Sequence, residues 1–82
     1  MNETLEDQVR RIIAGFVNVP PAQLSAEALL TEHDGWDSFQ QLSLVLELES
    51  RFGVHLRPEH IEQMQSLGSV VKVLDSRLSI RL

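Results

Sequence analysis

Two stretches of this sequence repeat their apolar residues at spacings of one, three and four, which keeps them on one face of an α-helix. The first stretch covers residues 5–17 and contains Leu5, Val9, Ile12, Ile13, Phe16 and Val17. The second covers residues 67–78 and contains Leu67, Val70, Val71, Leu74 and Leu78. No strand pattern extends beyond residues 54–56. The sequence therefore predicts an all-α fold.

Residues at the ends of the first stretch predict where its helix begins and ends. Thr4 and Asp7 have the spacing of a capping box, with Asp in place of the usual Glu. Asn18 and the two prolines after it predict the end of the helix. The connection from residue 18 to residue 37 is long for so small a chain, and we expect one short helical turn near residues 25–30. We expect three leucines to pin this connection to the core: Leu24, Leu29 and Leu30.

Similar signals predict three further helices. Asp37 or Ser38 caps a second helix that runs to about residue 52, and Gly53 suits the left-handed position just past its end. Pro58 opens a short third helix, and Ser66 caps the fourth. The third helix is expected to carry two apolar residues, Ile61 and Met64. The predicted architecture is a four-helix bundle with a short third helix and a long loop between helices one and two.

Length and composition limit the organisation and the partners of the chain. Its 82 residues are enough for one small core and too few for two, so we expect residues 1–82 to form a single domain. A net charge of −5 argues against nucleic acid and favours basic protein surfaces as partners. The sequence has no cysteine, which excludes disulfides, cysteine-ligated zinc and a cysteine nucleophile. With no apolar run long enough to span a bilayer and no signal-peptide pattern, we expect a cytoplasmic protein. We also expect it to be a monomer.

The predicted second helix carries more apolar residues than one buried face requires. One face consists of Gln41, Leu44, Val45, Leu48 and Phe52. Phe39, Leu42 and Leu46 form a second face, rotated away from the first. An exposed apolar face bordered by acids is typical of a docking surface, although the long connection could instead fold over it. Six acids and no Lys or Arg lie between residues 27 and 50, which favours a basic partner.

Ser38 lies where the second helix begins, after a loop that Gly35 closes. Unpaired backbone amides and the helix dipole at such a position favour an attached or bound phosphate. A serine at the start of a helix most often serves only as a cap. From the residues alone, both interpretations remain open.

The helix that begins at this serine resembles the Asp-Ser-Leu helix of acyl carrier proteins and their peptidyl-carrier relatives. The resemblance rests on the run Gly35-Trp36-Asp37-Ser38-Phe39 and on the later residues Leu42, Leu44, Val45, Leu48, Glu49 and Phe52. It extends over about residues 5–78, because the family has the same order of an amphipathic first helix, a long loop, a serine-opened second helix, a short third helix and a capped fourth.

This resemblance implies a carrier function. Ser38 would receive a 4′-phosphopantetheine arm from coenzyme A, attached by a phosphopantetheinyl transferase. An acyl- or aminoacyl-loading ligase would then place a group on the arm's thiol as a thioester, for delivery to a downstream synthase or transferase. The family's recognition surface would fall on Asp37, Phe39, Gln40, Leu42, Leu46, Glu47 and Ile61. The resemblance implies neither catalytic residues nor a metal.

Some positions depart from the pattern of fatty-acid carriers. Where many of those carriers have acids, this chain has Gln40 and Ser43, which leaves Glu47 as the acid one turn further along. Phe39 replaces the usual Leu, and Trp36 before the aspartate is common in stand-alone carriers. These departures favour a dedicated carrier of a secondary or cell-surface pathway over the housekeeping fatty-acid carrier.

Other functions are compatible with parts of the sequence. A hydrolase triad could be drawn from Ser38, His33 and Asp34 or Asp37, but the chain lacks a Gly-x-Ser-x-Gly motif and a sheet to hold it. The three histidines could suggest a metal site, although only two of them lie close in sequence and a proline separates those. The main alternative is an unmodified helical adaptor that binds a partner protein through the exposed face of the second helix.

Overall fold

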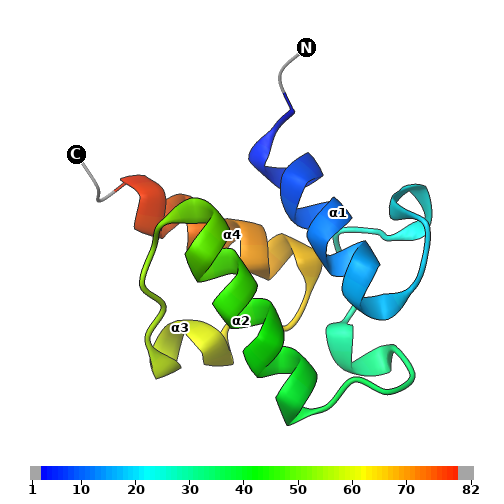
Figure 1. Cartoon of the computed structure of the whole chain (residues 1–82). Helices are drawn as coiled ribbons and strands as arrows, with labels where there is room; N and C mark the ends of the chain where they lie inside the picture. The colour runs from blue at the N-terminus through cyan, green and yellow to red at the C-terminus, as the bar shows by residue number, and fades with distance from the viewer. Residues whose placement is uncertain (1–2, 80–82) are drawn as a thin grey trace.

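The computed structural model describes residues 3–79, and this part of the chain contains four α-helices arranged as a small bundle (Figure 1). The helices are α1 (Leu5–Val17), α2 (Ser38–Phe52), α3 (Pro58–Glu62) and α4 (Leu67–Ser79). Two 3-10 turns, η1 (Pro21–Gln23) and η2 (Leu30–Glu32), lie in the long connection between α1 and α2. The predicted all-α fold, with its short third helix, is confirmed.

The ends of α1 follow from the residues that flank it. The Asp7 backbone N–H donates to Thr4 Oγ1 at 3.0 Å, so the predicted N-terminal cap forms. Asn18 ends the helix in the left-handed conformation, with φ of 62°. Between these ends, Val9 and Ile13 are fully buried, which confirms the predicted apolar face.

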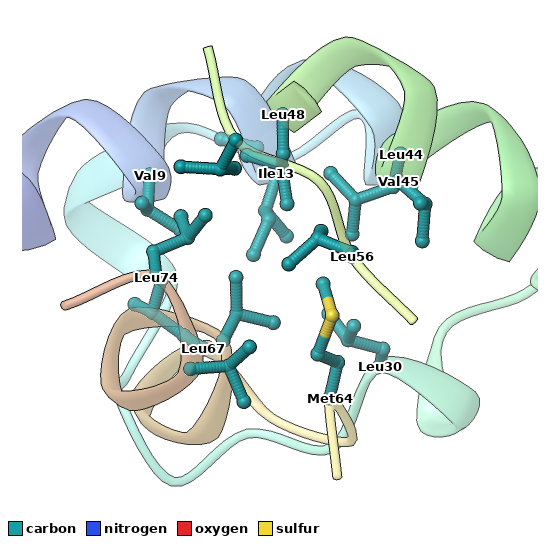
Figure 2. Close-up of a cluster of buried hydrophobic side chains, with 14 of the residues drawn as sticks. Val9, Ile13, Leu30, Leu44, Val45, Leu48, Leu56, Met64, Leu67 and Leu74 are labelled. Atoms are coloured by element: carbon teal, nitrogen blue, oxygen red, sulfur yellow. The ribbon is translucent and has the colours of Figure 1, made fainter. Parts of the chain in front are cut away.

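The core is formed by one face of each long helix and by residues from the connections. α1 packs mainly along α4 and also contacts α2. Figure 2 shows these buried side chains pointing toward one another from several elements. The labelled members are Val9, Ile13, Leu30, Leu44, Val45, Leu48, Leu56, Met64, Leu67 and Leu74. Each fully buried Leu, Ile or Val of this cluster contributes about 1.5–3 kcal/mol to folding.

The long connection differs from its prediction. Its two 3-10 helices form at η1 and η2, and within residues 25–30 a single turn forms in which the Ala28 N–H donates to the Ser25 carbonyl at 3.2 Å. Leu24 and Leu30 are buried as expected, whereas Leu29 is 41 % exposed. The backbone of Leu29 forms a single antiparallel bridge with Ser66, which fixes the chain there without burying the leucine side chain.

Hydrogen bonds to the start of α4 explain where this connection lies. The Leu30 N–H donates to the Gln65 carbonyl, and the Gly68 N–H donates to the Ala26 carbonyl, both at 2.8 Å. Gly68 permits this approach because a Cβ there would lie 3.1 Å from the Ala26 oxygen. The connection is therefore tied to the segment that enters α4.

The segment between α3 and α4 also differs in one detail from its prediction. Met64 is buried, but it follows the end of α3 instead of lying within it. Ser66 caps α4 as predicted, because its Oγ accepts a hydrogen bond from the Ser69 N–H at 3.2 Å. None of the helices in residues 3–79 has both the length and the apolar character that crossing a membrane requires.

Candidate functional site

The start of α2 is the place where the candidate site residues gather. Gly35 has a φ of 82°, in the left-handed region that favours glycine, and turns the connection toward α2. Asp37 is the N-cap residue of α2, and its Oδ1 accepts the Gln40 N–H at 2.9 Å. Ser38 is the first residue of the helix. The sequence allowed either residue as the cap, and the structure assigns that role to Asp37.

Ser38 is exposed and lies at the rim of a hollow. The hollow has a volume of about 480 Å³ and a mainly apolar lining from the connection, α2 and α3. The lining residues are Thr31, Trp36, Asp37, Ser38, Gln41, Leu42, Val45 and Ile61. A group attached to the Ser38 oxygen would therefore have both solvent and an apolar recess within reach.

Hydrogen bonds join Gln41 of α2 to a residue before this helix and to a residue after α3. The Trp36 indole Nε1 donates to Gln41 Oε1 at 3.2 Å, and Gln41 Nε2 donates to the Met64 carbonyl at 3.4 Å. The sequence assigned Gln41 to the buried face of α2 but did not predict this network. The sequence did contain a signal for such a network, because the Gln41 carboxamide stands in an otherwise apolar stripe. A polar group that faces a core needs hydrogen-bond partners.

The two predicted faces of α2 are both present. Leu44, Val45 and Leu48 are buried in the core. Phe39, Leu42 and Leu46 stay exposed, at 73 %, 54 % and 57 % respectively. The long connection does not cover these three side chains, and an apolar surface of this kind on a small protein is typical of a protein-binding site.

The other expected recognition residues differ in their exposure and in their charge partners. Ile61 of α3 is half-buried and lines the hollow together with Leu42. Gln40 is half-buried in the first turn of α2. Glu47 forms an ion pair with Arg51 one turn later, so its negative charge is partly balanced. Of the two acids among the expected recognition residues, Asp37 and Glu47, Glu47 therefore contributes less to a negative surface.

The histidines do not assemble a catalytic or metal site in the described part of the chain. No hydrogen bond connects Ser38 with His33 there. His60 Nδ1 accepts the Arg57 backbone N–H at 3.0 Å, and His55 lies 3.5 Å from a carboxylate oxygen of Glu49. Within residues 3–79, no three His, Cys, Asp or Glu side chains come close enough together to hold a metal ion.

Comparison with known proteins gives consistent results. The family described as "Phosphopantetheine attachment site" matches residues 7–74. The acyl carrier protein of Helicobacter pylori strain G27 is 34 % identical over 71 residues, which cover 87 % of this chain and 91 % of that protein. The acyl carrier protein of Thermotoga maritima is 30 % identical over 76 residues, which cover 93 % of this chain and 94 % of that protein.

Solved structures show the same fold. The holo acyl carrier protein from Geobacter metallireducens aligns with a TM-score of 0.79 and 18 % identity, over 94 % of this chain and 88 % of that one. The acyl carrier protein from Enterococcus faecalis aligns with a TM-score of 0.76 and 25 % identity, over 89 % of this chain and 92 % of that one.

Proposed function

Because this chain belongs to the phosphopantetheine attachment-site family, we propose that Ser38 is the residue to which its 4′-phosphopantetheine arm is attached. The family relationship makes the chain a carrier protein, which holds acyl groups as thioesters on that covalently bound cofactor. The observation that carries the choice of Ser38 is its place as an exposed first residue of α2 at the rim of an apolar hollow.

The attachment step has a simple chemical balance. The Ser38 oxygen forms a bond to the pantetheine-bearing phosphorus of coenzyme A, and its proton passes to a base of the transferase or to solvent. The phosphoanhydride bond breaks, and adenosine 3′,5′-bisphosphate leaves. The product is a phosphodiester with one negative charge, and the N-terminus of α2 stabilises that charge through its amides and the helix dipole.

The chain supplies no competing thiol for the later thioester chemistry. It contains no cysteine, so the arm's terminal thiol is the one nucleophile of this kind that the carrier would offer. Attachment to a small carrier also keeps the cargo at an effective concentration on the order of millimolar for each docked enzyme. We therefore assign this chain the role of presenting a substrate and not of catalysing its conversion.

We propose that partner enzymes bind a recognition face around the start and middle of α2. It comprises Asp37, Phe39, Gln40, Leu42, Leu46, Glu47 and Ile61. The exposed apolar side chains supply contact area, and the acids favour a basic partner surface. The partners would be a phosphopantetheinyl transferase, a loading ligase and a downstream synthase or transferase.

The proposal also covers the domain organisation, the oligomeric state and the cellular location of the carrier. We propose that residues 1–82 act as a single domain and that the carrier is a cytoplasmic monomer. A carrier must leave one enzyme before it reaches the next, and a small docking surface suits such brief complexes.

The test is enzymatic loading followed by intact-mass measurement. Incubation with coenzyme A and a broad-specificity phosphopantetheinyl transferase is expected to add the mass of one arm to the wild-type chain. Ser38→Ala is expected to abolish the gain, and Ser43→Ala, a half-buried serine of the same helix, is expected to retain it. No gain in the wild type with several transferases would favour the adaptor alternative, and a gain in Ser38→Ala would place the arm elsewhere.

A further inference from the structure

Resting on attachment at Ser38, we propose that the Gln41 carboxamide is a latch that closes the bundle below the arm. Short acyl groups fit in the open hollow, whereas the latch excludes long alkyl chains from the core. Gln41 is in this sense a specificity-determining residue for the cargo.

The position of Gln41 places it between the attachment point and the interior. It follows Ser38 by three residues in α2, so the two side chains lie on the same side of the helix, one turn apart. Both residues line the hollow. A chain that enters the bundle from Ser38 would pass this carboxamide first.

The two hydrogen bonds of Gln41 join three segments of the protein. Its Oε1 accepts from the indole of Trp36, which precedes α2, at 3.2 Å. Its Nε2 donates to the carbonyl of Met64, which follows α3, at 3.4 Å. Separating α2 from the end of α3 would break this second bond and leave part-buried polar groups without their partners, which is unfavourable.

The side chains behind the latch are already buried in the core. They include Met64 and, from the long connection, Leu30. Figure 2 shows these two side chains and Leu56 directed into the same cluster. A long alkyl chain would therefore have to displace core contacts as well as open the latch.

The hollow itself offers a place for a smaller group. Leu42, Val45 and Ile61 give it apolar walls, and its volume of about 480 Å³ is open to solvent. Such a recess has room for a short acyl group that stays in contact with solvent, without any movement of α2. The substrate class that fits the unaltered structure is a short acyl or aminoacyl thioester.

The test compares short and long cargo in the wild type and in Gln41→Leu, which keeps a similar side-chain volume but removes both hydrogen bonds. Acetyl- and dodecanoyl-pantetheine arms are loaded from the corresponding coenzyme A esters. The rate at which hydroxylamine cleaves each thioester is divided by the rate for the free acyl-pantetheine. For the wild type we expect the same normalised rate for both groups, because neither enters the core.

In Gln41→Leu we expect the dodecanoyl thioester to be cleaved more slowly than the acetyl one. The equilibrium constant for entry of the chain, which is the acetyl-to-dodecanoyl rate ratio minus one, should rise about five-fold, the factor that corresponds to one net hydrogen bond lost from the closed state. Trp36→Phe removes the indole donor without altering Gln41 and is expected to shift the ratio in the same direction. Gln63→Leu makes the same chemical change at an exposed position beyond α3 and is expected to behave as wild type.

Strong protection of the dodecanoyl thioester in the wild type would overturn the latch, as would identical rates for both groups in Gln41→Leu and Trp36→Phe. Measuring the intact mass distinguishes failure of the latch from failure of attachment at Ser38. If no arm is added to the wild-type chain, attachment at Ser38 fails, and the latch fails with it. If the arm is added but the rates contradict the expectation, only the latch is wrong.

Discussion

At the residue scale, the start of α2 divides two tasks between neighbouring side chains. Asp37 uses its carboxylate to satisfy the Gln40 amide, so the exposed hydroxyl of Ser38 is not needed as the cap. Capping the helix therefore does not account for the serine at this position. The sequence could not settle it, because both residues have side chains that cap helices and their spacings to the next turn are equivalent.

The cap can be tested separately from the attachment chemistry. We expect Asp37→Ala to lower the free energy of unfolding by about 1 kcal/mol, because the Gln40 amide loses its side-chain acceptor. Urea denaturation measures this change. Asp34→Ala removes an exposed acid from the preceding loop and should leave stability within about 0.5 kcal/mol of the wild type. Equal stability of Asp37→Ala and Asp34→Ala would show that the cap contributes nothing.

At the element scale, α2 works as a helix with a buried face and an exposed apolar face. Both were predictable, because the apolar residues exceed what one stripe can hold and their spacings separate them into two sets. The start of each described helix was also predictable to within one residue, since caps such as Thr4 and Ser66 act over only a few positions.

The connection between α1 and α2 was less predictable than the helices. Its turns depend on the hydrogen bonds of Leu30 with Gln65 and of Gly68 with Ala26, which join residues far apart in sequence. The Gln41 network was missed for the same reason, because Met64 is distant in sequence. Local sequence patterns contain no information on which of these distant groups meet.

The exposed face of α2 leads to a second prediction. We expect Leu42→Asp and Leu46→Asp to reduce loading by the transferase while the helical circular dichroism signal stays unchanged, because both side chains are more than half exposed. Ser76→Asp adds the same charge at an exposed position on α4 and should be loaded normally.

Leu44→Ala is the contrasting variant on the buried face of the same helix. Its side chain is fully buried, so we expect a loss of about 2–5 kcal/mol in the free energy of unfolding. Normal loading of both Leu42→Asp and Leu46→Asp would place these leucines outside the docking surface.

At the scale of the whole molecule, charge and architecture act together. The net charge is −5, and the segment from residue 27 to residue 50 contains six acids and no Lys or Arg. The connection leads directly to the start of α2 (Figure 1), so two acids of this segment, Asp34 and Asp37, immediately precede the proposed attachment point in the chain. The resulting field would attract a basic partner before contact is made.

This long-range attraction predicts a dependence on salt. We expect kcat/KM for transferase loading to fall as ionic strength rises, because exposed charges more than about 10 Å apart are largely screened at 0.1 M salt. Asp34→Asn should lower kcat/KM by about three-fold at low salt and converge with the wild type at high salt. Asp75→Asn, the same change on α4, should have little effect. A loading rate that does not change with salt would contradict electrostatic steering.

The most direct test of carriage on Ser38 is the intact mass of the protein purified from its native host, followed by mapping of the modified peptide. We predict a mass increased by one 4′-phosphopantetheine arm, free or acylated, located on the peptide that contains Ser38. Native protein that is wholly unmodified, or that bears the arm on another residue, would contradict the assignment.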